Sequence, residues 1–231
     1  MTTATPNTNT AATSATIAGA ASPAAPLVLY RMSLSGHSHR VQLFLSLLGL
    51  PHRLVDVDLR GGEHLREPFR RLNPFGQVPV LDDNGTILAD SNAILVYLAM
   101  RYDDGRWLPH DPAGAAAVQR WLSVAAGEIA FGPATARLAN LIGAPVDADA
   151  AIARARRLFD LMEPILAATP YLTGATPTLA DVAAYSYIAR AEEGNVPLAP
   201  YPALAGWLRR VESLPGFVPM PATPIGLLAA A

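Results

Sequence analysis

The sequence predicts a small α/β domain followed by an all-helical domain. Three observations lead to this fold class. A strand, a helix and a second strand follow one another within about thirty residues, a DDNG turn signal joins two more short strands, and the chain after residue 112 shows only helical patterns. The predicted element order of the first domain is therefore β-α-β-α-β-β-α.

The first three elements form a βαβ unit. Residues 27–30 are predicted to form a buried strand and residues 38–48 a helix. The apolar face of this helix carries Val41, Phe44, Leu45 and Leu48. Gly49 and Pro51 end the helix, and the alternating residues 53–59 form a strand with one wetter side. Because a helix connects them, the two strands are expected to run parallel with a right-handed crossover.

The remaining elements are predicted from turn signals and helical periodicity. A short helix is expected around residues 68–72, followed by strands at 78–81 and 86–89 and a helix at 91–101. The predicted helices of the second domain, separated by Gly and Pro, span 113–141, 149–168, 178–192 and 201–213. The TLAD run that opens the third of these is a capping box, so a structural role is expected for its Asp181.

These elements divide the chain into five expected parts. Residues 1–26 contain no charged side chain and are expected to form a disordered tail. The first domain is expected at 27–102, the helical domain at 113–220, a turn-rich linker at 103–112 and a C-terminal tail at 221–231.

Composition limits the classes of function. The 231 residues carry a formal net charge of -2, so no basic field attracts nucleic acid. The absence of Cys excludes disulfides, thiolate metal sites and cysteine nucleophiles. No apolar run has the length needed to cross a bilayer, and the N-terminal segment lacks the basic start and apolar middle of a secretory signal. We therefore expect neither a nucleic acid nor a membrane as a partner.

The loop at residues 33–38 joins the first predicted strand to the first predicted helix. Ligands of such α/β units bind beyond the carboxyl ends of the parallel strands, and a helix N-terminus stabilises an anion there. Ser35 adds a hydroxyl donor at the same place, and because a hydroxyl does not change redox state, a non-redox role is expected. A helix cap alone is the alternative for Ser35.

The GQVPVL segment, residues 76–81, is a second candidate for ligand binding. Pro79 cannot donate to a sheet ladder, so it favours an edge strand or a turn. A cis Val78–Pro79 bond would turn the backbone N–H and C=O of Val78 outward, where an extended peptide can pair with them. A trans proline on an edge strand is the alternative.

Polar residues at another predicted helix start complete the candidate site. Ser91 is a ready N-cap, yet Asp90 beside it could bind an ammonium while the helix end binds a carboxylate. Together the two residues would recognise an α-amino acid head group. His64 and Gln77 can hydrogen-bond a carboxylate, although a loop histidine is more often solvated.

The order of these segments resembles that of a known family. LYRMSLSGHSHRV, GEH, NPFGQVPVL and DSNAILVYLA look like the successive glutathione-site segments of the cytosolic glutathione transferases, in particular of serine-type bacterial members. WLRRVESLPGF at residues 207–217 is similar to the final helix of the family. The resemblance covers residues 27–220 and implies a thioredoxin-like first domain, with an electrophile site carried by the helical domain.

The resemblance implies a role for each matching residue. Ser35 matches the hydroxyl that hydrogen-bonds the glutathione sulfur, and Val78 and Pro79 match the cis-proline clamp on the cysteinyl unit. His37 stands where related bacterial members often carry Asn, so its role at the glutathione site stays open.

The same resemblance implies which residues bind the two ends of glutathione. Asp90 and Ser91 match the acid-serine pair that holds the γ-glutamyl head, with Asp90 one methylene shorter than the commoner Glu. His64 and Gln77 match donors near the glycyl carboxylate and the peptide backbone. Met32, Leu34 and helical-domain residues near Trp121, Phe131 and Arg137 are expected to line the electrophile pocket.

The implied activity is addition of glutathione, as its thiolate, to small electrophiles. Glutathione-dependent isomerisation, dehalogenation or peroxide or disulfide reduction on the same fold is the alternative enzyme function, and a non-catalytic glutathione-binding module or an inherited pocket is the alternative outside catalysis. The resemblance further implies a cytoplasmic homodimer with a role in detoxification, with glutathione as cosubstrate and no metal.

Overall fold

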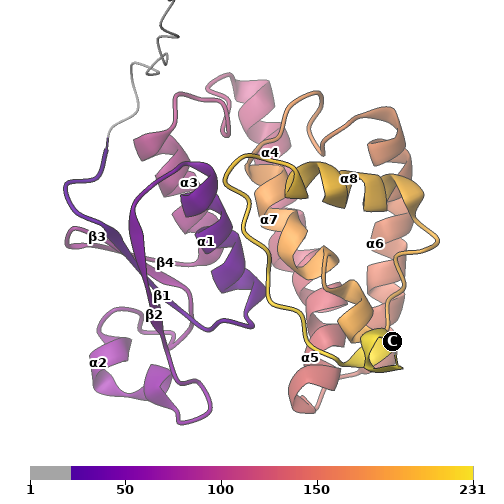
Figure 1. The fold of residues 1–231 in the computed structure, drawn as a ribbon, viewed down its shortest axis with the longest axis horizontal. Helices are drawn as coiled ribbons and strands as arrows, with labels where there is room; N and C mark the ends of the chain where they lie inside the picture. The colour runs from indigo at the N-terminus through magenta and orange to yellow at the C-terminus, as the bar shows by residue number, and fades with distance from the viewer. Residues whose placement is uncertain (1–21, 231) are drawn as a thin grey trace, which may run out of the picture.

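The structure is a computed structural model that describes residues 22–230. An N-terminal α/β part lies beside a C-terminal helical part, as Figure 1 shows in indigo to magenta and in pink to yellow. Most of the predicted N-terminal tail, residues 1–21, lies outside the described residues. Among the described helices, none combines the length and the apolar character that a bilayer crossing needs.

A mixed sheet of four strands forms the centre of the N-terminal part, in the order β2-β1-β3-β4. The strands are β1 (Leu27–Arg31), β2 (His52–Asp56), β3 (Val80–Asp83) and β4 (Thr86–Ala89). β1 pairs with β2 in parallel, as the βαβ prediction requires, and with β3 in antiparallel. β3 and β4 form the predicted hairpin.

Helices cover both faces of this sheet. They are α1 (Gly36–Leu47), the 3-10 turn η1 (Glu63–Leu65), α2 (Glu67–Arg70) and α3 (Ser91–Tyr102). Successive strand residues point to opposite faces, so Leu29 joins the core with α1 and α3, while Tyr30 meets Phe69 of α2 with ring centroids 6.5 Å apart. α1 and α3 thus lie between the sheet and the helical part (Figure 1).

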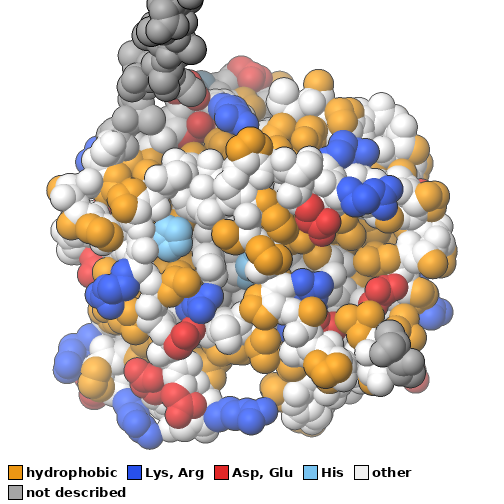
Figure 2. Space-filling view, in the orientation of Figure 1, with side chains coloured by type: hydrophobic (Ala, Val, Ile, Leu, Met, Phe, Trp, Pro, Cys, Tyr) orange, Lys and Arg blue, Asp and Glu red, His pale blue; other side chains and the backbone are white. Residues whose placement is uncertain are grey.

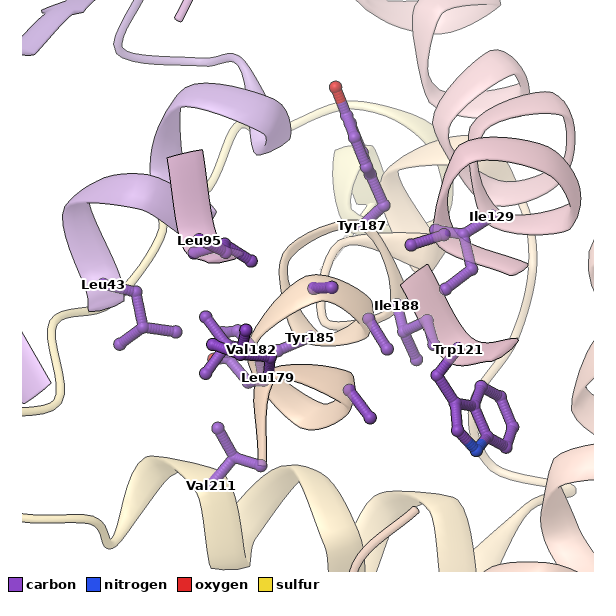
Figure 3. Packing of buried hydrophobic residues seen from close by; sticks show 14 of the residues in the cluster. Leu43, Leu95, Trp121, Ile129, Leu179, Val182, Tyr185, Tyr187, Ile188 and Val211 are labelled. Atoms are coloured by element: carbon purple, nitrogen blue, oxygen red, sulfur yellow. The ribbon is translucent and has the colours of Figure 1, made fainter. Parts of the chain in front are cut away.

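The C-terminal part is helical throughout. Its elements are α4 (Pro112–Val124), the π-helix η2 (Ala125–Ala134), α5 (Thr135–Ile142), α6 (Ala148–Ala168), α7 (Leu179–Ile188), the 3-10 turn η3 (Ala191–Gly194), α8 (Pro202–Glu212) and the 3-10 turn η4 (Gly226–Ala230). Every residue of α7 is buried. Figure 3 shows why: Leu43 of α1, Leu95 of α3 and Ile129 of η2 surround this helix, so one apolar cluster joins the two parts.

Two predicted helices have different limits in the structure. The predicted helix at 113–141 is divided into α4, η2 and α5, with Pro133 inside the π-helical stretch. A proline has no N–H and its ring collides with the carbonyl of the preceding turn, which favours a wider turn. The predicted helix at 178–192 ends at Ile188, because Arg190 leaves helical geometry with φ -114° and ψ 18°.

Two predicted strands also shift. The strand predicted at 53–59 ends at Asp56, because the amide of Asp58 is taken by the Glu63 carboxylate at 2.7 Å. The strand predicted at 78–81 begins only at Val80, after Pro79, which has no N–H to give to the ladder.

The predicted capping box at the start of α7 is confirmed. The Thr178 side chain accepts from the helix amides, and the Asp181 carboxylate accepts from the Thr178 N–H at 2.9 Å. The same carboxylate accepts from the Leu172 N–H and from Nε1 of Trp207. Burial raises the pKa of Asp181, and these hydrogen bonds oppose that shift. Asp181 therefore has the structural role that its motif predicts.

Candidate active site

A cavity of about 650 Å³ lies between the two parts of the molecule. In Figure 2 the lower edge of the surface is notched between the side that carries α2 and the side that carries α5. The structure brings all eight predicted glutathione-site residues to the lining of this cavity: Ser35, His37, His64, Gln77, Val78, Pro79, Asp90 and Ser91. They come from four separate segments of the N-terminal part. The opposite wall comes from α5 and α7.

Ser35 caps the first helix at the edge of the cavity. Its backbone is extended, and its Oγ accepts a hydrogen bond from the Ser38 N–H at 3.2 Å. A second turn bond, from the Ser35 N–H to the Met32 carbonyl at 3.0 Å, fixes the loop that leads into α1. The hydroxyl still has its own proton to donate, so capping the helix and binding a ligand are compatible.

His37 is a neutral group at this site. Its Nδ1 lies 3.4 Å from the Ser91 Oγ, and its ring stands edge-on to Tyr187 with centroids 5.1 Å apart. Burial lowers the pKa of His37 to about 3, and the positive charge of Arg40 acts in the same direction. The imidazole is therefore uncharged at neutral pH and can act toward a ligand only as a hydrogen-bonding group.

Arg40 places a buried positive charge behind the cavity. It is 1% exposed, and its Nη1 donates to the Ser91 Oγ at 3.2 Å and to the Asn92 Oδ1 at 2.9 Å. Within residues 22–230 its Nε and Nη2 meet no hydrogen-bond partner, and none of the ion pairs includes it. Burial lowers the pKa of Arg40 to about 10, so the side chain stays charged at neutral pH.

Asp90, and not Ser91, is the N-cap of α3. The Asp90 Oδ1 accepts from the N–H groups of Asn92 and Ala93, both at 2.9 Å. Ser91 is instead the first helical residue, buried to 4% exposure, where its Oγ accepts from Arg40. The prediction that Ser91 caps the helix is therefore wrong. Both cap bonds go to the same carboxylate oxygen of Asp90, so within residues 22–230 its Oδ2 accepts no hydrogen bond and is open to a cation.

The remaining predicted residues line the side of the cavity near η1. The Val78–Pro79 peptide is cis. The Gln77 carbonyl accepts from the Asn73 side chain at 2.8 Å, while the Gln77 side chain is exposed. His64 lies in η1, and its Nδ1 is buried without a partner among the described residues.

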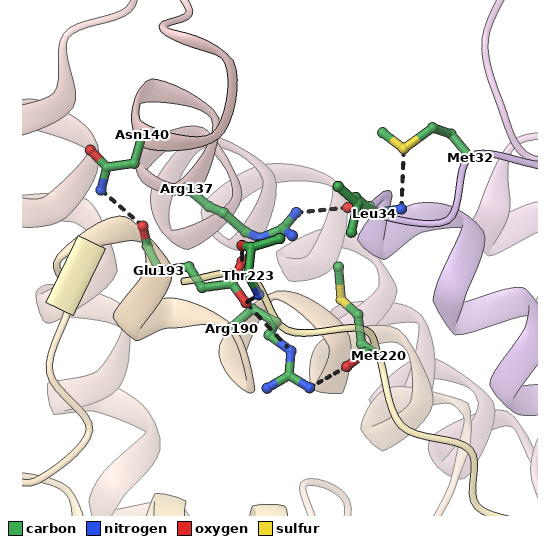
Figure 4. A network of polar contacts seen from close by, with 8 residues as sticks. All are labelled: Met32, Leu34, Arg137, Asn140, Arg190, Glu193, Met220 and Thr223. Atoms are coloured by element: carbon green, nitrogen blue, oxygen red, sulfur yellow. Dashed lines mark hydrogen bonds and ion pairs between the residues drawn. The ribbon is translucent and has the colours of Figure 1, made fainter. Parts of the chain in front are cut away.

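The opposite wall is anchored by a buried ion pair. Arg137 of α5 is 1% exposed and Glu193 is 0% exposed, with Nε and Oε2 2.6 Å apart. Figure 4 shows that the Nη1 of Arg137 also reaches the N-terminal part, where it donates to the Leu34 carbonyl at 2.7 Å. Glu193 accepts in turn from the Thr223 hydroxyl at 2.6 Å. The loop before Ser35 is thus connected through two charged side chains to the C-terminal segment.

The residues that line the electrophile side of the cavity differ in part from the predicted ones. Met32, Leu34 and Arg137 line the cavity as predicted. Trp121 does not, because it is buried in the helical core with its Nε1 donating to the Leu172 carbonyl. Phe131 is also absent from the lining and is 62% exposed.

Several side chains of this region were not predicted, among them Arg40, Leu138, Leu141 and Tyr187. The position of Arg40 could have been predicted from the sequence. It follows His37 by three residues and lies within the apolar pattern of α1. A buried charged side chain there needs polar partners. Tyr187 carries no such signal, since only the packing of α7 distinguishes it from Tyr185. Among residues 22–230 no group of three acidic or histidine side chains is arranged to hold a metal ion.

Comparison with known proteins identifies the family. The family model described as "Glutathione S-transferase, N-terminal domain" matches residues 34–101, and that described as "Glutathione S-transferase, C-terminal domain" matches residues 136–210. The chain is 34% identical over 220 residues to glutathione S-transferase 3 of Zea mays, covering 87% of this chain and 98% of that one. It is 33% identical over 194 residues to the maleylpyruvate isomerase of a Ralstonia species, covering 76% and 87%.

The fold leads to the same family. A crystal structure of a glutathione S-transferase from Pseudomonas fluorescens superposes with a TM-score of 0.80 at 35% identity, covering 85% of this chain and 99% of that one. The thioredoxin-like first domain and the helical second domain predicted from the sequence are both present. The chain belongs to the glutathione S-transferase family.

Proposed function

We propose that this glutathione transferase binds glutathione along the N-terminal wall of the cavity and that Ser35 activates the thiol for attack on a small electrophile. One observation carries the proposal: the eight residues predicted for the glutathione site, which come from four separate segments, line one cavity. Sequence spacing alone does not impose that convergence.

Thiolate formation at Ser35 follows from hydrogen bonding and helix polarity. A free thiol has a pKa of about 8.5, so only a small fraction is ionised at neutral pH. The Ser35 hydroxyl and the first amides of α1 favour the charged form. A hydrogen bond to a charged group contributes roughly 1.5–3 kcal/mol, which lowers a pKa by about one to two units. Because burial lowers the pKa of His37 to about 3, its imidazole is too weak a base to hold the thiol proton at neutral pH. The sulfur therefore acts as nucleophile without a protein base.

The two ends of glutathione would meet opposite charges. The free oxygen of Asp90 would accept from the γ-glutamyl ammonium, and the Ser91 hydroxyl would donate to the adjacent carboxylate. Arg40 supports this arrangement because its buried charge lies behind Ser91, attracted by the Asp90 carboxylate although no ion pair among residues 22–230 includes it. At the other end, His64 and Gln77 would donate to the glycyl carboxylate, with the backbone of Val78 beside the cysteinyl unit.

The biological setting belongs to the same proposal. We expect a homodimer of cytoplasmic location that acts in detoxification, with glutathione as cosubstrate and small electrophiles as acceptors. A glutathione-dependent isomerase is the second candidate, because one relative at 33% identity has the name maleylpyruvate isomerase. Both reactions need the same thiolate, so they share the test below.

The test is the variant Ser35→Ala, with Ser33→Ala as its control in the same loop. Ser33 does not line the cavity. In Ser35→Ala the pKa of bound glutathione, followed by thiolate absorbance, should rise by about one to two units, and conjugation at neutral pH should fall at least about tenfold. Ser33→Ala should keep both values. Thiolate absorbance and turnover equal to those of the parent in Ser35→Ala would refute the role of Ser35, and no binding heat with reduced glutathione would refute the site.

A further inference from the structure

One methionine, Met32, holds the loop that carries Ser35. The Met32 N–H donates to the Ser38 Oγ at 3.3 Å, and the Met32 carbonyl accepts from the Ser35 N–H at 3.0 Å. The Met32 sulfur accepts from the Leu34 N–H at 3.1 Å, a contact that Figure 4 shows. The side chain and the backbone of Met32 therefore both position the residues around the Ser35 hydroxyl.

The sulfur contact has no substitute in this part of the structure. Among the hydrogen bonds of residues 22–230, the Leu34 N–H has this sulfur as its acceptor and no other. The Leu34 carbonyl is held from the other side by the Arg137 guanidinium at 2.7 Å. A chemical change at the Met32 sulfur thus acts directly on the backbone of the residue before Ser35.

Met32 differs from the other described methionines in its access to solvent. Met162 and Met220 are 0% and 1% exposed. Met100 is 75% exposed on α3 and does not line the cavity. Met32 is half-buried and lines the cavity, so a small molecule that enters the cavity can reach it. Within residues 22–230 it is the methionine that is both accessible and bonded through its sulfur to the backbone.

Methionine is the oxidisable sulfur of this chain, because the sequence contains no Cys. Oxidation turns a flexible, apolar thioether into a polar, chiral sulfoxide, and reductases specific for each sulfoxide epimer reverse the change. Such a reaction at a buried methionine disrupts the core, and at a freely exposed one it changes little. At Met32 it would change a contact that positions Ser35.

We propose that Met32 is a modification site, at which a small hydroperoxide converts the thioether to a sulfoxide and thereby weakens thiol activation at Ser35. This inference rests on the proposed role of Ser35 in glutathione transfer. It adds a reversible control by oxidants to that activity, exerted by a residue that positions the loop.

The oxidation balances in one step. A lone pair of the Met32 sulfur attacks the hydroxyl oxygen of the hydroperoxide, the S–O bond forms and the O–O bond breaks. The sulfur loses two electrons. The departing oxygen keeps the electron pair of the O–O bond and takes the proton of the transferred hydroxyl, so the second product is an alcohol, or water where the reagent is hydrogen peroxide.

The sulfoxide cannot keep the geometry of the reduced loop. Its oxygen is now the acceptor, and it stands one bond farther along the side chain than the sulfur did, so the Leu34 N–H must move to reach it. Ser35 moves with this segment, because its N–H is bonded to the Met32 carbonyl. Hydrogen bonds weaken steeply when their angle or distance departs from the favoured range, so a displaced Ser35 hydroxyl stabilises a thiolate less.

The test treats the full chain with hydrogen peroxide and compares the parent with Met32→Leu and Met100→Leu. Leu and Met have similar volumes, and thermal unfolding checks that each variant keeps the fold. Peptide mass spectrometry measures the sulfoxide at each methionine. After the peroxide is removed, conjugation of chlorodinitrobenzene, an aryl halide, and the pKa of bound glutathione are measured relative to the untreated sample of the same variant.

Conjugation by the parent should fall in step with sulfoxide formation at Met32, to about a tenth at neutral pH, and the pKa of bound glutathione should rise by about one unit, which is the effect of losing one hydrogen bond to the thiolate. Treated Met100→Leu should show the same loss. Treated Met32→Leu should stay within about twofold of its own untreated rate. Sulfoxide reductases for both epimers should restore the treated parent.

Three outcomes would each overturn the inference and leave the proposed transfer intact. They are a parent that keeps its rate and thiol pKa with Met32 oxidised, a Met32→Leu variant that loses as much as the parent, and a Met32 that stays reduced while Met100 is fully oxidised. An untreated parent that binds no glutathione and conjugates no electrophile would overturn the proposed function and this inference together.

Discussion

The two walls of the cavity are built in different ways. The N-terminal wall takes its polar groups from short turns and helix starts, where the neighbours of each residue in the sequence already fix its backbone. The C-terminal wall takes its groups from α5 and α7, and the buried Arg137–Glu193 pair anchors it. The first wall is therefore locally encoded, whereas the second exists only when distant helices are packed.

The walls also differ in the charge states of their buried ionisable side chains. In α1, burial keeps two histidines neutral, His37 on the N-terminal wall and His39 outside the cavity lining, and lowers their pKa values to about 3 and about 4. On the C-terminal side, a cation and an anion are buried together. Acid should thus weaken the first wall, and loss of one partner should weaken the second. Four experiments test this difference, from the largest expected effect to the smallest.

The largest effect is expected from Glu193→Gln. The neutral side chain leaves the Arg137 cation buried without its partner, and removal of one member of a buried pair typically costs about 3–5 kcal/mol in the free energy of unfolding. Urea denaturation measures the loss. The matched control is Glu128→Gln in the Arg154–Glu128 pair, whose side chains are 40% and 49% exposed, and there the change should stay below about 1 kcal/mol. Similar losses in the two variants would contradict the contrast.

The second effect is a fall in stability with acid. Both histidines have folded pKa values below the unfolded value of 6.5, so the unfolded chain binds their protons first as the pH falls. Stability is therefore full above pH 6.5 and is lost toward pH 4, by up to about 1.4 kcal/mol per pH unit for each histidine. Denaturation between pH 7 and pH 5 measures this slope. His37→Asn should reduce it by about the share of one histidine, and an unchanged slope would contradict the buried neutral state.

The third experiment adds a methyl group at the contact between the two walls. Gly36→Ala places a Cβ 2.7 Å from the Tyr187 ring, so the interface must open, and overpacking of this kind typically costs about 1–3 kcal/mol. Gly127→Ala is the control, because that helical glycine has nothing within 4 Å of its added Cβ and should gain up to about 1 kcal/mol. Thermal unfolding compares them. A Gly36→Ala variant as stable as the parent would show that the walls are not in close contact.

The smallest effect separates capping from ligand binding at Asp90. Asn caps a helix about as well as Asp, so Asp90→Asn should change the free energy of unfolding by less than about 0.5 kcal/mol. Loss of the negative charge should weaken glutathione binding about tenfold, which calorimetry measures. Asp90→Ala should show the same weaker binding together with about 1 kcal/mol of lost stability. Unchanged affinity in Asp90→Asn would leave Asp90 as a cap alone.

Much of the first wall was predictable, and the reason is local. Ser35, Pro79 and Asp90 stand at a helix start, a strand start and a second helix start, and each position restricts the backbone by itself. Ser91 shows the limit of this reasoning. Its residue type favours a cap, yet the Arg40 side chain, fifty-one positions away in the sequence, takes its hydroxyl and leaves the cap to Asp90.

The second wall was predictable only in part. Arg137 was expected near the electrophile, but its partner Glu193 was not, because no local pattern relates residues so far apart in the chain. The pocket was also expected near Trp121 and Phe131, but Trp121 packs in the helical core and Phe131 faces solvent. Apolar side chains on a helix can face several neighbours, so their type does not reveal which space they line.

By itself the sequence determined the order of the N-terminal elements, the parallel βαβ unit, the capping box of α7 and the polar side chains of the N-terminal wall of the cavity. Those features depend on residues close together in the chain, whose backbone preferences act whatever the rest of the fold does. Only the tertiary structure decided that Arg40 bonds Ser91 and has no ion-pair partner within residues 22–230, that Arg137 pairs with Glu193, and that the hydroxyl end of the Tyr187 ring lies against Gly36. These depend on how α1, α5 and α7 pack, since burial and distance, and not residue type, set the charge and the free hydrogen bonds of each group.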